Sequence, residues 1–214
     1  MFHATHRPGR RHILALPLLA SIGVQAQEAP LRIGAIYSIT GPGSFLGAPE
    51  DRALRALLEE ANKAGGWKGR KLEAVVYDTE GNTGKAAQQM RRLASVDNVD
   101  VIFGPSSSGE SLATLALANE LKVPVLMHGG AESITRPVTP YVFNTPPSDR
   151  IALSGLLAHL KARGIASVAM LSAADGFGQS GKNVLQEIAP SYGIQVALQE
   201  EFNRQDPDIT AQVL

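Results

Sequence analysis

The sequence contains no cysteine, no net charge at neutral pH and no long uninterrupted hydrophobic run. Without cysteine, the protein has no disulfide framework, no thiolate metal site, no catalytic thiol and no lipid-modified N-terminal cysteine. Its 20 basic and 20 acidic residues balance, and no Lys/Arg run follows the first dozen residues, so the basic surface that nucleic-acid binding requires is missing. No His/Asp/Glu cluster has metal-ligand spacing. We therefore expect neither a metal nor a cofactor.

The first 26 residues are typical of a cleavable export signal. Three arginines within the first eleven residues precede an apolar stretch at residues 13–20, and Val24-Gln25-Ala26 fits a small-residue cleavage site. Pro17 interrupts the apolar stretch, which is shorter than the roughly 20 residues of a membrane span. We expect export to the periplasm by the Sec or the twin-arginine route, with cleavage after Ala26. The other interpretation is a buried N-terminal helix.

Beyond the export signal, apolar strands alternate with amphipathic helices. The expected strands are residues 33–37, 72–77, 99–103, 124–127, 141–143, 168–171 and 194–198. Strands without polar alternation, each followed by a helix such as the one carrying Leu54, Leu57 and Leu58, predict a doubly wound parallel α/β sheet. Such sheets bind ligands beyond the carboxyl ends of their strands. The turns to examine are therefore residues 40–47, 78–84, 104–109 and 173–178.

The two prolines within residues 144–149 predict an extended crossover between two lobes. We expect lobe 1 to span residues 27–146 and lobe 2 to span residues 147–214. Lobe 2 contains two full strands, fewer than a stable sheet usually needs, and the chain ends two turns into an apolar helix. The pattern predicts an essentially complete first lobe and a truncated second lobe.

Residues 104–110 form a serine-rich turn at the start of a helix. The hydroxyls of Ser106, Ser107 and Ser108, with the free N–H groups of the helix, suit a carboxylate or phosphate. The alternative is that one serine caps the helix and the others are turn residues. A Gly-x-Ser-x-Gly nucleophile elbow would need glycine where Ser108 stands, so this hydrolase signature is absent.

Several other residues allow both a functional and a structural interpretation. Residues 176–183 nearly match a phosphate-binding loop, but Asn183 replaces the hydroxyl that ligates magnesium, which favours the alternative of a Gly-rich turn into a helix with a solvated Lys182. Asp78 lines the crevice or caps the next helix, and Phe45 and Leu46 line a pocket or pack in the core. His128 approaches a ligand or is a hydrogen-bonded structural histidine.

Several motifs, taken together and in order, resemble the periplasmic leucine/isoleucine/valine-binding protein family. They are Ile33-Gly34-Ala35-Ile36, Thr40-Gly41-Pro42, Asn62-Lys63-Ala64-Gly65-Gly66, Tyr77-Asp78, Gly104-Pro105-Ser106-Ser107-Ser108, Val123-Pro124, Val142-Phe143-Asn144-Thr145 and Asp175-Gly176-Phe177-Gly178. The resemblance implies a type I periplasmic binding fold, in which two lobes joined by three crossings close on a ligand without catalysis.

The resemblance also implies binding residues. The serine turn is similar to the loop that receives a ligand's α-carboxylate, which points to Ser107 and Ser108, with Ser106 lining the site. Leu46 matches a pocket position, and Phe177 matches the aromatic residue that closes over the ligand from the second lobe.

The segment after the Val123-Pro124 strand departs from the family. Where the family has an Ala-Thr pair, this chain has Gly130-Ala131, and we expect these residues to offer backbone groups. The missing threonine leaves open which amino acid or amide is bound.

The function implied by the resemblance is capture of an amino acid or a related small carboxylate or amide for an ABC importer. The partners would be that ligand and inner-membrane permease subunits, and the protein would be monomeric. The alternatives are a sensory or regulatory binding module of the same fold and, less well supported, an exported α/β hydrolase.

Family members are about twice as long as the mature chain, which resembles their N-terminal half. We therefore expect weak or no ligand binding by this chain alone.

Overall fold

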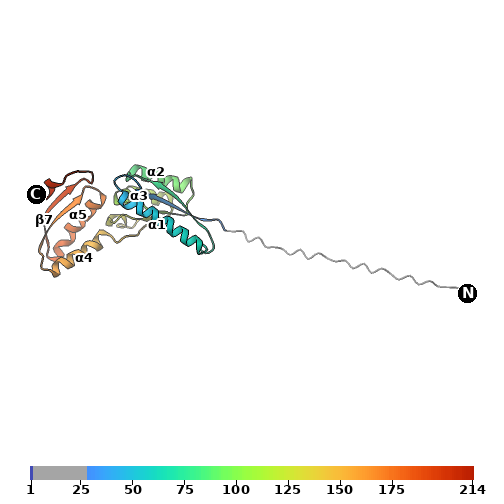
Figure 1. Ribbon diagram of the computed structural model, residues 1–214. Helices are drawn as coiled ribbons and strands as arrows, with labels where there is room; N and C mark the ends of the chain where they lie inside the picture. Colours follow the sequence, from blue (N-terminus) through green and yellow to red (C-terminus); the bar gives the residue numbers. More distant parts are fainter. Residues whose placement is uncertain (2–27) are drawn as a thin grey trace.

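The computed structural model describes Met1 and residues 28–214, so the predicted export signal lies almost wholly outside the described residues. These residues form two α/β units (Figure 1). The first unit contains a five-stranded sheet and the second a two-stranded sheet. The chain passes from the first unit to the second through residues 145–148, within the predicted crossover.

The first sheet is parallel throughout, as the sequence predicts. Its strands are β1 (Leu31–Tyr37), β2 (Leu72–Asp78), β3 (Val101–Phe103), β4 (Val125–Met127) and β5 (Val142–Asn144). The strand order is β2-β1-β3-β4-β5. This order reverses direction at β1, and ligands bind beside such a reversal in open α/β sheets.

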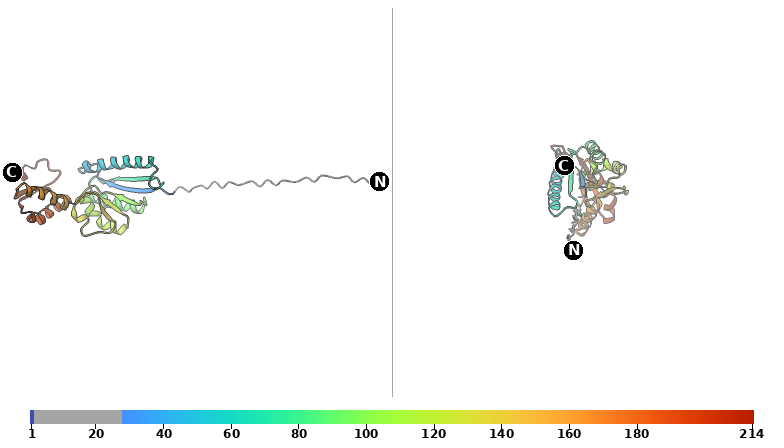
Figure 2. Two further views of the ribbon diagram at one scale, coloured as in Figure 1. Left: turned by 90° about the horizontal axis from the view of Figure 1, so that it is seen from below. Right: turned by 90° about the vertical axis from the view of Figure 1, so that its right-hand side faces the viewer.

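Helices cover both faces of the first sheet (Figure 2, left). Helix α1 (Ser44–Lys63) packs through Leu54 on one face, whereas α2 (Thr83–Ser95) and α3 (Ser108–Leu121) cover the other. Each face of the sheet has its own hydrophobic core. Consecutive residues of β1 point to opposite faces, so Tyr37 packs in the core with α1 and Ile36 packs in the core with α2 and α3. No helix within residues 28–214 is long and apolar enough to span a membrane.

Helix α1 differs from its predicted form in two ways. It begins at Ser44, so Phe45 and Leu46 lie in its first turn instead of in a loop. Gly47 permits this early start, because a Cβ there would stand 2.3 Å from the Ser38 backbone. Leu57 was expected on the buried face but is 63% exposed.

The second unit contains α4 (Asp149–Ala162), β6 (Ser167–Ala173), α5 (Gly176–Ile188), β7 (Gln195–Phe202) and the short α6 (Thr210–Val213). Strands β6 and β7 are parallel, and Leu157 of α4 and Leu185 of α5 form their core with Ile194. Two 3-10 turns, η1 (Glu132–Ile134) and η2 (Ala189–Tyr192), complete the two units.

The phosphate-loop interpretation of residues 176–183 does not hold. Helix α5 begins at Gly176 with Asp175 as its N-cap, so these residues form a helix and no loop is left to surround a phosphate. Lys182 is partly exposed, and its Nζ pairs with Oε1 of Glu201 at 2.8 Å.

Polar contacts join the two units beside the crossover. The Asp149 N–H donates to the Gly130 carbonyl at 2.8 Å, and the Asp149 carboxylate accepts from the Glu132 N–H at 3.2 Å. Arg150 of α4 pairs with Glu132 of η1 and with Glu187 of α5. Asp149 and Arg150 at the start of α4 therefore contact Gly130 and Glu132 of the first unit, and Arg150 also contacts α5 of the second unit.

Candidate functional site

A cavity of about 910 Å³ lies between the two units, and each of the seven strands within residues 28–214 contributes lining residues from the segment that follows it. Representative lining residues, in strand order, are Leu46, Thr83, Ser108, Gly130, Pro147, Phe177 and Asn203. The carboxyl edges of both sheets therefore face one cavity, which is where α/β sheets bind ligands.

Ser107 is the N-cap of α3. Its hydroxyl donates to the Glu110 carboxylate at 2.6 Å and accepts from the Glu110 N–H at 3.3 Å. The Ser107 backbone N–H also donates to the Glu110 carboxylate at 3.2 Å, which completes a capping box between the N-cap and the third helical residue. Ser107 is therefore the serine that caps the helix. Its hydroxyl already donates its proton to Glu110 and has none left for a ligand.

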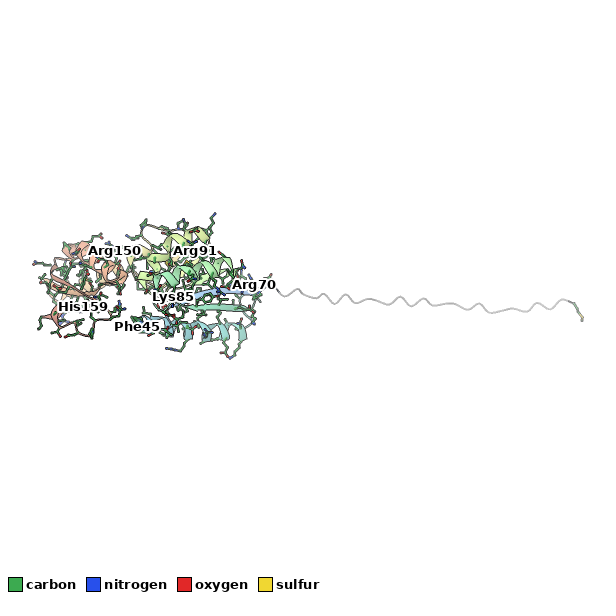
Figure 3. All side chains as sticks on the ribbon, turned by 90° about the horizontal axis from the view of Figure 1, so that it is seen from above. Phe45, Arg70, Lys85, Arg91, Arg150 and His159 are labelled. Carbon is green, nitrogen blue, oxygen red and sulfur yellow. The ribbon has the colours of Figure 1, made fainter. Side chains whose placement is uncertain are left out.

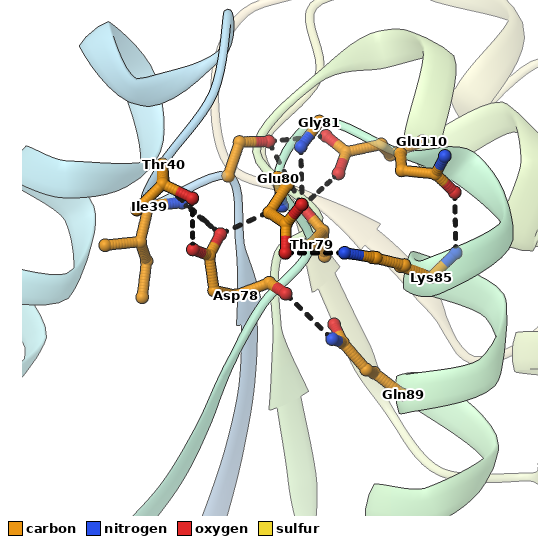
Figure 4. A network of polar contacts seen from close by, with 11 residues as sticks. Ile39, Thr40, Asp78, Thr79, Glu80, Gly81, Lys85, Gln89 and Glu110 are labelled. Carbon is orange, nitrogen blue, oxygen red and sulfur yellow. Dashed lines mark hydrogen bonds and ion pairs between the residues drawn. The ribbon is translucent and has the colours of Figure 1, made fainter.

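The Glu110 carboxylate holds three chain segments together behind the serine turn (Figure 4). It is fully buried and also accepts from the hydroxyls of Ser38 at 2.9 Å and of Thr79. Ser38 follows β1 and Thr79 follows β2. A buried carboxylate with this many donors is satisfied, and it fixes the strand ends relative to α3.

Ser106 and Ser108 differ in their free hydrogen-bonding capacity. The Ser106 hydroxyl donates to Glu50 and accepts from the Ser38 N–H at 3.1 Å. The Ser108 hydroxyl accepts from the Ala131 N–H at 3.2 Å, and its own proton has no acceptor among the described residues. Within residues 28–214 the N–H groups of Ser108 and Gly109 also lack acceptors. Three donors at a helix N-terminus suit an anionic group.

Asp78 fixes the turn that carries α1, which corrects both interpretations made from the sequence. Its carboxylate accepts from the Ile39 N–H at 2.9 Å and the Thr40 hydroxyl at 2.6 Å (Figure 4). Helix α2 is capped instead by Asn82. Burial alone would raise the pKa of Asp78, but the hydrogen bonds from Thr40, Glu80 and Ile39 outweigh it and lower the pKa.

Of the predicted pair that follows β4, Gly130 lines the cavity and Ala131 does not. A Cβ on Gly130 would stand 3.1 Å from the Phe177 ring, so glycine allows Phe177 of the second unit to approach. Ala131 is fully buried, its N–H donates to Ser108, and its carbonyl accepts from the Ile134 N–H at 3.1 Å. The expectation that Ala131 offers a backbone group is therefore corrected by its position behind Ser108.

The second unit presents a charged pair beside Phe177. The Asp175 carboxylate accepts from the N–H groups of Phe177 at 3.0 Å and Gly178 at 2.9 Å, and it pairs with Arg204 at 2.5 Å. Burial opposes ionisation of Asp175, yet the bonds from Gly178 and Arg204 lower its pKa. Arg204 also lies 5.9 Å from the centre of the Phe45 ring, at the edge of the first unit that faces the second (Figure 3).

His128 follows β4 and lines the cavity. Its ring stacks on Tyr37 with centroids 5.6 Å apart, and its Nδ1 lies 3.1 Å from Oε1 of Glu50. Both interpretations made from the sequence are compatible with this position, since the ring has a structural partner and also borders the cavity.

The structure brings six of the seven predicted site residues to one cavity: Leu46, Ser106, Ser107, Ser108, Gly130 and Phe177. The turn at residues 78–84 was singled out from the sequence, but its Asn82 was not predicted as a site residue, and neither were Asn203 and Arg204 after β7. The rule that ligands bind at the carboxyl ends of strands, applied to every strand, would have found these residues.

Comparison with known proteins gives consistent matches. Residues 30–214 match the sequence model of a family described as Periplasmic binding protein. The chain is 35% identical over 127 residues, 58% of its length, to Leu/Ile/Val-binding protein homolog 7 of Brucella suis biovar 1 (strain 1330). It is 29% identical over 196 residues, 90% of its length, to homolog 8 of the same strain.

A solved structure shows the same architecture. An extracellular ligand-binding receptor from Rhodopseudomonas palustris HaA2 superposes with a TM-score of 0.79 and 29% identity, over 87% of this chain and 51% of the receptor. The matched regions cover 32% of homolog 7 and 46% of homolog 8. The chain therefore spans at most about half the length of these similar proteins.

Proposed function

Because the chain belongs to the periplasmic binding protein family, we propose that it captures an amino acid or a related small carboxylate or amide outside the cytoplasm for delivery to an ABC importer. In this proposal residues 27–146 form lobe 1, residues 147–214 belong to lobe 2, and the ligand lies between them. The names of the two Brucella relatives support the amino-acid class, since both are called Leu/Ile/Val-binding protein homologs.

The observation that carries the proposal is the set of free donors at the start of α3. The Ser108 hydroxyl and the N–H groups of Ser108 and Gly109 have no acceptors within residues 28–214, and both residues line the cavity. A carboxylate accepts such donors with charge-assisted hydrogen bonds. Phe45 and Leu46 on one side and Phe177 on the other offer apolar surface for the rest of a small ligand.

The same geometry favours binding over hydrolysis. In hydrolases of the Ser-His-Asp type, the nucleophilic serine is hydrogen-bonded to a histidine. Ser106 and Ser107 donate to the carboxylates of Glu50 and Glu110, and no serine hydroxyl in the described part of the chain is hydrogen-bonded to His128. We therefore place the protein among binding proteins and not among exported hydrolases.

Delivery to a permease and delivery to a receptor are both compatible with the cavity. The importer role is the one we propose, and the second candidate is a sensory module of the same fold. Genes for permease and ATPase subunits next to this one would support transport, whereas a neighbouring receptor or regulator gene would support sensing.

The test of binding is a calorimetric titration of the exported chain with amino acids, their amides and small carboxylates. We expect carboxylate ligands to bind weakly, at millimolar concentration, because the chain spans at most about half the length of its relatives, and we expect Ser108→Ala to weaken them more than it weakens the matching amides. Ser154→Ala, in α4 and outside the cavity lining, is the control and leaves affinity unchanged. Equal weakening by both substitutions, or no carboxylate binding by wild type at millimolar concentration, would contradict the proposal.

A further inference from the structure

Within residues 28–214, Arg204 is the only lysine or arginine that lines the cavity. It lies in the segment after β7, and its guanidinium reaches from the second unit to the first. The Nε–H donates to Oδ2 of Asp175 at 2.5 Å, and Cζ lies 5.9 Å from the centre of the Phe45 ring in the first turn of α1. Asp175 and Phe45 both line the cavity, so the guanidinium is placed at its wall.

Most of the hydrogen-bonding capacity of Arg204 is unused. A guanidinium has five N–H donors, and within residues 28–214 only the Nε–H of Arg204 has an acceptor. The side chain is 40% exposed although it lines the cavity, so a ligand can reach it. The donors of the two Nη groups lie in one plane and carry a permanent charge, which matches the two oxygens of a carboxylate.

The acidic residues of the cavity wall have partners of their own. The Asp175 carboxylate accepts from the N–H groups of Phe177 and Gly178 as well as from Arg204, and it caps α5, whose N-terminus carries partial positive charge. Glu80 pairs with Lys85 at 2.5 Å. The negative charges of both residues are therefore compensated, and Arg204 can bind a further carboxylate beside Asp175.

Arg204 also stands apart from the free donors at the start of α3. Those donors belong to the first unit, whereas Arg204 extends from the second unit toward α1. A volume of about 910 Å³ is near the upper end of the range for small-molecule sites. The cavity therefore has room for a ligand with two separate polar ends.

We propose that Arg204 is a specificity-determining residue that binds a second anionic group of the ligand, so that the cavity takes acidic amino acids and similar dicarboxylates in preference to neutral amino acids. This inference rests on the proposed function and names the ligand class of that site. A distal amide forms the weaker contact with the guanidinium, because it has one acceptor oxygen and no charge. The Phe45 ring supports the guanidinium from the first unit.

The experiment is an NMR titration of the ¹⁵N-labelled chain at pH 7 with two matched ligand pairs, L-glutamate with L-glutamine and L-aspartate with L-asparagine. The members of a pair differ only in the distal carboxylate or amide. We expect wild type to bind at least one acid about tenfold more tightly than its amide, the smaller effect of a hydrogen bond to a charged group. Arg204→Gln should bring this ratio to about twofold or less.

The matched control is Arg163→Gln, which should keep the wild-type ratio. Arg163 is the C-cap of α4, is exposed and lies outside the cavity lining. The ratio within a pair separates binding from folding, because a loss of stability in Arg204→Gln affects both members equally. A second measurement needs no variant, since raising NaCl from about 50 mM to about 500 mM should weaken the acid more than its amide.

The outcomes distinguish this inference from the proposed function. Ratios near one in wild type, a ratio retained in Arg204→Gln, equal salt sensitivity within a pair, or binding of other carboxylates but of neither acid would overturn this inference alone. Failure of the acids, the amides, neutral amino acids and monocarboxylates to bind at millimolar concentration would overturn the proposed function and this inference together.

Discussion

Gly176 at the start of α5 lies against Gly109 in the first turn of α3, so closely that a Cβ on Gly176 would stand 3.1 Å from the Gly109 Cα. The two helices belong to different units, and their N-termini meet at the cavity. Because a helix N-terminus carries partial positive charge, this meeting point favours a negatively charged group.

The first turn of α5 depends on a second glycine. A Cβ on Gly178 would stand 1.9 Å from the Ala173 carbonyl oxygen, whereas one on Gly181 of the same helix would meet only the Met170 side chain at 3.6 Å. We expect Gly178→Ala to reduce the free energy of unfolding by about 3 kcal/mol, because backbone must move. Gly181→Ala is the control and should raise it by about 0.5–1 kcal/mol. Urea denaturation measures both, and equal effects would contradict the assigned packing.

We expect substitution of Ser107 to change the stability of the protein and substitution of Ser108 to change its affinity for a carboxylate ligand. Ser107→Ala removes the α3 N-cap and should cost about 1 kcal/mol of stability. Ser108→Ala should weaken carboxylate binding about 10-fold to 100-fold, because a hydrogen bond to a charged group contributes about 1.5–3 kcal/mol. Thermal unfolding and calorimetry give the two numbers. A large affinity loss in Ser107→Ala at unchanged stability would reverse the assigned roles.

Glu110 should be a strong determinant of stability. Glu110→Gln replaces one acceptor oxygen with an NH₂ group that faces donors, so we expect a loss of about 2–4 kcal/mol in urea denaturation. Glu120 lies on the same helix and forms an exposed ion pair with Arg91 at 3.0 Å, so Glu120→Gln is a matched control. This control should lose no more than about 0.5 kcal/mol. Similar losses for both variants would mean that the buried network contributes little.

The sequence predicted the parallel sheet well because its strands are apolar without alternation, a pattern that depends on each strand alone. Local chemistry also predicted the serine turn at the start of α3. The contacts of Glu110 and Asp78 could not be predicted, since each joins segments about 30 to 70 residues apart that meet only in the folded sheet. Ala131 was misplaced for the same reason, because only the folded chain shows that Ser108 stands in front of it.

Asp78 makes part of the stability depend on pH. Its pKa is lowered in the folded state, so its contribution is present above the unfolded value of about 3.9 and is lost as pH falls through the lower folded pKa. We expect Asp78→Asn to be less stable than wild type at pH 7, with a difference that shrinks below about pH 4. Urea denaturation at pH 7, 4 and 2.5 tests this, and a difference that grows on acidification would contradict it.

The strand ends of both units line one cavity, which we propose binds a carboxylate. The most direct measurement is an NMR titration of the ¹⁵N-labelled chain with a carboxylate ligand up to millimolar concentration, where weak binding is still visible. We expect the backbone resonances of Ser108, Gly109 and Gly130 to shift together with those of Phe177 and Gly178, with one shared affinity. Shifts confined to one unit, shifts elsewhere, or none at all would contradict it.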